Sequence, residues 1–591
     1  MKGSDTRKAF LDFFAKNGHT VVPSSSLLPD DPSVLLTTAG MQQFKPYYLP
    51  TGRQADAVRD FKSLNTASSQ KCFRTSDIDE VGDDTHLTFF EMLGNFSFGG
   101  YLKEGAIRLA HEFITKELGL EISYVTIFEG SHGVPKDDES RAVWQALDVK
   151  DIREEGINDV FWGPTGTSGP CGPTTEIYCK NASGQDVEVW NLVFNEYFYP
   201  GTREELLGSS TSKSLEKLKA PGVDTGMGLE RLAMIIQKKR NLFETDLFAP
   251  FLELVPHELG ERVRRVIVDH IRGSAFLIAD GVRPSNKEAG YILRRLLRRV
   301  FAFEELYKMP IHIVDALLHD IVHEYGETYK DLGAKADMVR AEVTVERERF
   351  VRTLKGGIKE MEKLSVIGAT AAFNLYQSFG ISYEIIKDVA KEKAKSLARE
   401  DFEAELQKHQ EKSRQGAEKK FGGHGLILDT GELKAKDAAE LQKVTRLHSA
   451  THLLQASLRK VLGDEVHQMG SDITVERTRF DFAFGRKMTP DELKKVEDII
   501  NGAIEKDYAV TKKLLPFDEA VKTGALYFFK EKYPEMVNVY TFGTPGESEI
   551  FSREFCGGPH VTHTREIGKF RILKEEASSA GVRRIRATIE P

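Results

Sequence analysis

The sequence has very little cysteine, with four residues among 591, at Cys72, Cys171, Cys179 and Cys556. So few and widely spaced thiols cannot form the disulfide framework of a small secreted domain, and they indicate a reducing compartment. Long hydrophobic runs are also missing, both in residues 1–20, where a secretory signal would lie, and elsewhere at the length needed to cross a bilayer. We therefore expect a cytoplasmic protein without membrane segments.

A strong charge of one sign is absent as well, because the formal net charge is only −8. A nucleic-acid partner would have to be met by a local basic surface rather than by the chain as a whole. The remaining composition, 40% hydrophobic and 29% charged, is typical of a soluble globular protein. A chain of 591 residues can form three or four domains, each with its own core.

The order of local patterns predicts a multidomain α+β protein in four parts. Residues 1–240 mix strand-like and helical segments with glycine-rich turns, and residues 241–390 are mainly helical in pattern with a basic centre. The charged stretch 388–420 predicts a solvated connecting helix, and we assign the charged helical linker between domains to 391–425. Residues 426–591 predict a final α+β domain.

Two short C-terminal motifs offer metal ligands, HSATH at 448–452 and CGGPH at 556–560. Residues 447–462 predict a helix, and the i,i+4 spacing places His448 and His452 on one face of it. Together with Cys556 and His560, this gives the three imidazoles and one thiol that zinc accepts in tetrahedral coordination. The alternative is a buried cysteine and loop histidines held by structural hydrogen bonds.

Three segments of the N-terminal half carry further chemistry. Residues 70–94 predict two antiparallel strands joined by a long Asp-rich loop, with Arg74 and aromatic residues able to clamp a phosphate and stack a base. Residues 161–176 contain glycines that permit close backbone approach to a ligand. Residues 222–231 predict a glycine-rich strand that continues into a helix, with Arg231 in its first turn. Each segment alone also fits an ordinary hairpin, turn or strand-to-helix corner.

Taken in order, these motifs resemble those of the alanyl-tRNA synthetases, a family of class II aminoacyl-tRNA synthetases. TFFEMLGNFSFG (88–99) is similar to the family's motif 2, and DTGMGLER (224–231) is similar to its motif 3. GPCGP (169–173), VWNLVF (189–194), DGVRPSN (280–286), GYILRR (290–295) and the two metal motifs also follow the family's order. The resemblance implies an antiparallel-sheet catalytic domain at 1–240, a helical tRNA-recognition domain at 241–390, and an α+β zinc-containing editing domain at 426–591.

The resemblance also implies an enzyme that uses ATP with Mg²⁺ to ligate L-alanine to tRNA(Ala). Arg74 would hold the α-phosphate of ATP and Arg231 the γ-phosphate, with Asp224 as the third catalytic residue. The nucleotide would further contact Phe90, Trp162, Trp190 and Gly228. The amino acid would be received by Asn191, Asp224 and Trp162, with the Asp224 carboxylate pairing with its ammonium group.

The stretch 288–303 predicts a helix with an apolar stripe and with four arginines on its other faces, at Arg294, Arg295, Arg298 and Arg299. Because few acids lie nearby in the sequence, we expect contact with RNA phosphates rather than the alternative, a solvated face with intrahelical ion pairs. By resemblance, Asn286 would hydrogen-bond the acceptor stem of the tRNA, a role for which a side-chain amide is suited.

A hydrophobic pocket sized for a methyl group rejects glycine or serine by only ~10–200-fold, so a second site that hydrolyses Ser-tRNA and Gly-tRNA has a chemical purpose. The resemblance implies that residues 426–591 provide this site. One Zn²⁺ would be bound by His448, His452, Cys556 and His560. The misacylated ester would lie near Thr451 and Gln468.

Several features depart from the family's pattern. Leu87 replaces the second of two histidines, Gln377 replaces an aspartate, and Pro559 replaces a threonine. Too few residues separate Gly425 from His448 for the small β-barrel that typically precedes HSATH, and the C-terminal dimerisation extension is missing. We therefore expect a minimal, monomeric form. The alternatives are an editing-only protein or an RNA-binding paralogue without adenylation activity.

Overall fold

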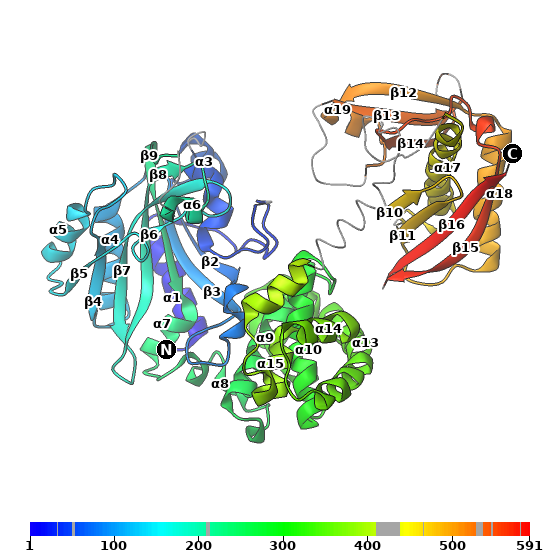
Figure 1. Ribbon diagram of the computed structural model, residues 1–591. Coiled ribbons are helices and arrows are strands. Elements are labelled where there is room, and N and C mark those ends of the chain that lie inside the picture. Colours follow the sequence, from blue (N-terminus) through cyan, green and yellow to red (C-terminus); the bar gives the residue numbers. More distant parts are fainter. Residues whose placement is uncertain are drawn as a thin grey trace. The chain divides into compact units, whose positions relative to one another are not determined.

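The computed structural model describes residues 1–31, 33–49, 54–208, 213–408, 438–464, 466–527, 536–544, 546, 548–579 and 581–590. The chain forms two compact units, Met1–Glu405 and Leu406–Pro591, which run from blue to yellow-green and from yellow to red in Figure 1. Each unit buries hydrophobic clusters of its own. None of the described helices is long and apolar enough to serve as a bilayer-spanning segment.

The first unit is built on a largely antiparallel sheet of nine strands, counted over the described residues. The strand order is β1 (Thr20–Val21), β2 (Asn65–Phe73), β3 (Phe89–Ser97), β9 (Glu216–Gly228), β8 (Asp186–Tyr199), β7 (Gly169–Lys180), β4 (Tyr124–Phe128) and β5 (Ile152–Glu155), with β6 (Phe161–Trp162) paired to β7. The β1–β2 and β4–β5 pairs are parallel, and the other pairs are antiparallel.

Two predicted pairs of elements at the centre of this sheet are confirmed. β2 and β3 are antiparallel, and they are joined by the segment 74–88, which contains the 3-10 helix η2 (Ser76–Asp79). β9 ends at Gly228 and α7 (Leu229–Ile236) begins at the next residue, which places Arg231 in the first turn of the helix. Because β3 pairs with β9, the two motifs are neighbours in the sheet.

Helices pack against the sheet and bury its apolar side chains. Phe10, Phe13 and Phe14 of α1 (Gly3–Lys16) form a cluster of aromatic rings with Phe113, the first residue of the π-helical turn η3 (Phe113–Glu117). Burial of four aromatic rings removes a large apolar area from water and anchors α1 to the sheet. The other helices of this part are η1 (Gly40–Phe44), α2 (Lys45–Tyr48), α3 (Gln54–Phe61), α4 (Lys103–Glu112), α5 (Asp138–Ala146) and α6 (Arg203–Leu207).

The rest of the first unit is helical, as predicted. It contains η4 (Leu242–Glu244), α8 (Ala249–Leu252), η5 (His257–Leu259), α9 (Glu261–Ala279), α10 (Glu288–Tyr307), α11 (His312–Gly326), α12 (Lys330–Ala334), α13 (Ala336–Lys363), α14 (Ala369–Phe379) and α15 (Tyr383–Ala390). The predicted apolar stripe of α10, at Leu293, Leu296, Leu297 and Val300, is fully buried. The 3.6-residue period of this stripe therefore identified the buried face correctly.

The charged stretch that begins at 388 is not one solvated helix over the described residues. α15 ends at Ala390, the 3-10 helix η6 (Lys391–Ala394) follows, and a separate helical segment occupies 399–408. This segment is not fully solvated because its few apolar side chains, Ala394, Leu397 and Phe402, are buried in the core of the first unit. Residues 409–437, including the predicted domain boundary at 425, lie outside the described residues.

The second unit is α+β, with two antiparallel sheets. The first has the order β10 (Gln468–Ile473), β11 (Thr478–Ala483), β16 (Val582–Glu590) and β15 (Lys569–Ser579), and the second has the order β12 (Ala509–Pro516), β13 (Met536–Gly543) and β14 (Ile550–Phe555). The helices are α17 (Ala438–Leu462), α18 (Pro490–Glu505), α19 (Phe517–Lys522) and η7 (Thr564–Ile567). The predicted helix at 447–462 is confirmed as part of α17, whose apolar residues Leu447, Leu454 and Leu458 are fully buried.

The fold class is therefore confirmed as multidomain α+β, with a mainly antiparallel sheet, a helical part and a separate α+β unit. The division of the chain at 240, 390 and 425 stays a prediction.

Candidate active site and metal centre

A cavity of about 430 Å³ lies in the first unit, against strands β3, β8 and β9. Its lining includes seven side chains or backbone positions that the sequence singled out, namely Arg74, Phe90, Trp162, Asn191, Asp224, Gly228 and Arg231. They come from distant segments and meet here because β3, β9 and β8 are neighbours in the sheet. A concave pocket with several convergent polar groups makes this cavity the candidate active site.

Two arginines supply positive charge to the cavity. Arg74 directly follows β2, is exposed, and holds its guanidinium carbon 5.0 Å from the centre of the Phe90 ring. Arg231 lies 3.0 Å from a carboxylate oxygen of Glu188 and also donates to the Glu188 carbonyl oxygen at 3.3 Å. Guanidinium groups match the geometry of phosphate oxygens, and the Phe90 ring offers a face for a base. This part of the cavity can hold a nucleotide.

Carboxyl and amide groups occupy the strand side of the cavity. Asp224 on β9 is 5% exposed, and burial raises its pKa to about 8. Asn191 on β8 donates through Nδ2 to Glu176 at 2.8 Å, and its Oδ1 atom is buried with no hydrogen-bond partner among the described residues. Burial and the charge of Glu188 also raise the pKa of Glu176 to about 8. Buried acceptors without a counter-charge favour a small cation such as an ammonium group.

The sequence did not identify all residues of this cavity. Glu176 lies in the glycine-rich segment 161–176 but had no assigned role. It stands opposite Asn191 in the β7–β8 register, so strand pairing is the signal that could have found it. Asp77, Glu188 and Arg203 also line the cavity. They come from three different elements, and no motif in the sequence connects them.

Trp190, which we expected to contact ATP, does not line the cavity. Its side chain is fully buried, and its ring packs against those of Phe10, Phe14 and Phe113 at centroid distances of 5.8, 6.2 and 5.8 Å. Successive side chains of a strand point to opposite faces, so Asn191 faces the cavity while Trp190 faces the core. The predicted ATP contact of Trp190 is therefore wrong.

The α10 arginines have acidic partners although few acids lie nearby in the sequence. Arg294 and Arg298 approach Glu346 of α13 at 3.2 and 2.8 Å. This carboxylate lies far along the chain, so a search of the neighbouring sequence could not find it. Asn286 is exposed and accepts a hydrogen bond from Arg294. Contact between these residues and tRNA stays a prediction.

The other two arginines of α10 hold the segment between β2 and β3. Arg295 lies 3.0 Å from Asp79 of η2, and Arg299 donates to the carbonyl oxygen of Ile78 at 2.8 Å. Arg299 is 2% exposed and also pairs with Asp388 at 2.8 Å. The segment that follows Arg74 is therefore fixed by the helical part of the unit.

Four side chains of the second unit come together as a candidate metal centre. The ligand atoms of His448, His452, Cys556 and His560 lie within 4.8 Å of one another. Burial would raise the pKa of the Cys556 thiol, but the charge of His452 and hydrogen bonds from the imidazoles lower it to about 2. A thiolate is the form of cysteine that binds metals, and on metal binding the imidazoles would lose their extra proton, which gives a donor set that suits a zinc ion.

The Nδ1 atoms of these histidines all lie close to oxygen atoms. His452 Nδ1 lies 2.7 Å from Glu554, which is buried beside it. His448 Nδ1 contacts a backbone carbonyl oxygen at 3.1 Å, and His560 Nδ1 contacts the Ser449 hydroxyl at 3.2 Å. The Nε2 atom of His560 is buried and lacks a hydrogen-bond partner in the part of the chain that the structure describes. Histidines that bind metals are oriented in this way, so the donor set fits the ion.

The two residues predicted for editing lie in the same unit. Thr451 precedes His452 on α17, and its hydroxyl donates to the carbonyl oxygen of His448 at 2.6 Å. Gln468 opens β10 and donates to the Ser471 hydroxyl at 3.0 Å. Their part in hydrolysis stays a prediction.

The chain matches two family models, "tRNA synthetases class II (A)" over residues 5–480 and "Threonyl and Alanyl tRNA synthetase second additional domain" over residues 537–586. It is 40% identical to the alanine–tRNA ligase of Borrelia hermsii, with 100% of both chains covered. The chain belongs to the alanine–tRNA ligase family. The ligase of Treponema pallidum is 38% identical, over 100% of this chain and 98% of the relative. That of Rubrobacter xylanophilus is 34% identical, over 99% of this chain and 78% of the relative.

Proposed function

We propose that the first-unit cavity activates L-alanine with ATP to alanyl-adenylate and transfers the alanyl group to the 3′ end of tRNA(Ala). The observation that carries this proposal is the joint presence of two arginines and of the Asp224–Asn191 pair in one cavity. The arginines suit the phosphates of ATP, and the Asp224–Asn191 pair suits the ammonium group of an amino acid.

The reaction needs charge stabilisation more than proton transfer. The alanine carboxylate attacks the α-phosphorus, a new oxygen–phosphorus bond forms, and the bond to pyrophosphate breaks. Arg74 would neutralise the α-phosphate and Arg231 the γ-phosphate, while the Phe90 ring stacks on adenine. Mg²⁺, bound with the ATP phosphates, would add further positive charge. Trp162 and Gly228 would complete the walls.

Asp224 and Asn191 would bind the ammonium group of alanine. The unpartnered Oδ1 atom of Asn191 needs a donor, and the buried Asp224 carboxyl group needs a cation when it ionises. Glu176 would hold the Asn191 amide in place through its 2.8 Å hydrogen bond. The carboxylate of alanine is then directed toward the nucleotide, which orients the attacking oxygen.

Alanine-dependent exchange of pyrophosphate into ATP tests this proposal. Arg74→Ala should abolish exchange, because it removes the guanidinium beside Phe90. Arg108→Ala is the matched control, since Arg108 is an exposed arginine of α4 paired with Glu104 and does not line the cavity. Absence of exchange with the folded wild-type protein would overturn the ligase function and favour the editing-only or RNA-binding alternative.

We further propose that the second unit binds one Zn²⁺ through His448, His452, Cys556 and His560, and hydrolyses Ser-tRNA(Ala) and Gly-tRNA(Ala). The convergent ligand atoms and the oriented imidazoles support this proposal. The metal would either act as a Lewis acid or fix the shape of the editing site beside Thr451 and Gln468. The protein would act as a cytoplasmic monomer and recognise tRNA through Asn286 and α10.

Metal analysis and deacylation assays test the editing site. The wild-type protein should contain one zinc ion per chain and release serine from Ser-tRNA(Ala). Cys556→Ser should lower both the zinc content and the rate of serine release, while alanine-dependent pyrophosphate exchange in the other unit should remain. Cys179→Ser, a change at a buried thiol of β7, is the matched control and should keep the metal. Retention of full zinc content by Cys556→Ser would contradict the proposed ligand set.

A further inference from the structure

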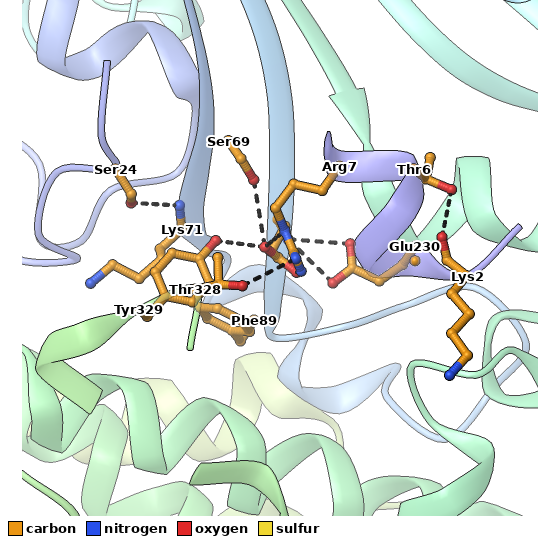
Figure 2. A network of polar contacts seen from close by, with 12 residues as sticks. Lys2, Thr6, Arg7, Ser24, Ser69, Lys71, Phe89, Glu230, Thr328 and Tyr329 are labelled. Carbon is orange, nitrogen blue, oxygen red and sulfur yellow. Dashed lines mark hydrogen bonds and ion pairs between the residues drawn. The ribbon is translucent and has the colours of Figure 1, made fainter. Parts of the chain in front are cut away.

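A buried polar network surrounds Glu91 of β3, and Figure 2 shows its members Arg7, Glu230 and Tyr329. Phe90 and Met92 line the cavity, so the alternation of the strand directs Glu91, between them, to the opposite face. Glu91 is fully buried. A buried carboxylate must be fully hydrogen-bonded to be tolerated, so its partners fix the strand at this point.

The partners of Glu91 come from elements far apart in the sequence. Arg7 of α1 binds both carboxylate oxygens, at 2.7 and 2.6 Å. The hydroxyl of Tyr329, in the turn between α11 and α12, donates to the same carboxylate at 2.5 Å. A bidentate arginine together with a phenol forms a strong, charge-assisted set of hydrogen bonds.

Glu230 connects this network to the cavity. Its carboxylate accepts the backbone N–H of Glu91 at 3.2 Å and pairs with the fully buried Arg272 of α9 at 2.5 Å. Arg272 also donates to the carbonyl oxygen of Phe89 at 3.1 Å. Glu230 lines the cavity and directly precedes Arg231. The backbone on both sides of Phe90 is therefore held by these two charged residues.

Tyr329 brings the helical part into contact with two strands at once. Its ring centre lies 5.7 Å from the ammonium group of Lys71 on β2, while its hydroxyl reaches Glu91 on β3. Lys71 and Glu91 are direct cross-strand partners, next to the pair formed by Cys72 and Phe90. Tyr329 thus spans the two strands beside the point where Phe90 enters the cavity.

We infer that Tyr329 is a positioning residue for the nucleotide, because through Glu91 it fixes β3 at Phe90, the ring that would stack on adenine. The inference rests on the proposed adenylation site and adds a residue that touches no substrate. Loss of the Tyr329 hydroxyl leaves Arg7 as the main anchor and loosens β3 at this point. Affinity for ATP then falls, whereas alanine, held on β8 and β9, is unaffected.

Tyr329→Phe tests this inference against Tyr325→Phe. Tyr325 is buried in the same cluster, and its hydroxyl has no hydrogen-bond partner among the residues that the structure describes. In pyrophosphate exchange, Tyr329→Phe should raise the KM for ATP by about three- to tenfold, the effect of one typical hydrogen bond, and leave the KM for alanine within about twofold. An unchanged KM for ATP, or an equal rise in Tyr325→Phe, would overturn the inference.

A binding measurement separates this inference from the proposed function. Isothermal titration with a non-hydrolysable ATP analogue should show the same loss of affinity in Tyr329→Phe. Glu91→Gln should weaken binding further, and addition of Tyr329→Phe to that variant should change little, since the two groups act through one contact. Absent exchange with intact analogue binding would overturn the proposed adenylation, while the titration still decides the role of Tyr329. If Glu91→Gln does not fold, Tyr329→Phe alone decides it.

Discussion

Burial sets the ionisation of individual carboxyl groups in the cavity, and Asp224 is the simplest case. It is nearly inaccessible to solvent, and burial raises its pKa to about 8. At neutral pH the free protein therefore holds mostly the protonated form, which cannot pair with an ammonium group. Binding of a cation favours the ionised form, so alanine binding is linked to release of a proton.

The KM for alanine should consequently fall as the pH rises from 6 to 8, by up to about tenfold per pH unit, and become constant above the pKa. Pyrophosphate exchange at saturating ATP measures this dependence. Asp224→Asn should raise the KM at every pH and remove its dependence on pH. A wild-type KM for alanine that is independent of pH between 6 and 8 would contradict the proposed pairing.

Glu554 illustrates a residue that acts one step away from the proposed metal. It was not predicted from the sequence, because the ligand spacing of HSATH and CGGPH contains no information about a carboxylate on β14. Its oxygen lies 2.7 Å from His452 Nδ1, where it orients the ring and raises the basicity of the other nitrogen. The charge of Glu554 opposes the effect of burial and raises the pKa of His452 to about 10.

Glu554→Gln should weaken zinc binding by about 10–100-fold while the four proposed ligands remain in place. Competition with a chromophoric chelator measures the change. Glu549→Gln is a suitable control, because Glu549 lies just before β14 but pairs with Lys506 at the surface. Equal zinc affinities of Glu554→Gln and wild type would show that the carboxylate has no role at the site.

Among the helices and strands, α10 shows that sequence patterns predict which face of a helix is buried but not which distant residues its polar side chains contact. The period of its apolar residues predicted the buried face, because that pattern is local. The partners of its arginines were not predictable, since Glu346, Asp79 and Asp388 belong to other elements that only the fold brings close. Sequence reasoning predicted that both Asn191 and Trp190 of β8 contact ligands, but only Asn191 lines the cavity. No local pattern identifies which face of β8 lies toward the cavity, so the error at Trp190 could not be avoided.

The contact between α10 and the segment 74–88 has a measurable consequence. Arg295→Gln removes the ion pair with Asp79 and should raise the KM for ATP several-fold, because Arg74 begins this segment. Arg298→Gln is the matched control on the same helix, since its partner Glu346 lies on α13. The pyrophosphate-exchange assay contains no tRNA, so a loss of contacts with tRNA phosphates cannot explain a difference in KM between the two variants. Equal values for the two variants would contradict this role of Arg295.

At the scale of the whole molecule, the chain consists of two units with separate cores. The overall α+β class, with a sheet-based part, a helical part and a separate α+β unit, followed from motif order. The extent of the first unit did not follow, because the apolar residues that attach 391–405 to its core are few and scattered among charged residues. Short amphipathic segments of this kind give a weak periodic signal.

Two units with separate cores should unfold in two thermal transitions of the intact chain. A chelator should lower the midpoint of one transition only, because a metal bound to the folded state stabilises the unit that holds it. ATP with alanine should raise the midpoint of the other. Differential scanning calorimetry measures both effects. A single transition that responds to chelator and to ATP alike would show that the units are not independent.

The four side chains of the metal centre also set an order of events during synthesis. His448 and Cys556 are separated by 108 positions, so a ribosome releases the histidine pair of α17 well before the thiol and the last imidazole. A nascent chain that ends before Cys556 carries two of the four groups and cannot close the cluster. The proposed four-ligand capture of zinc would therefore have to wait until both Cys556 and His560 have been translated and folded against α17.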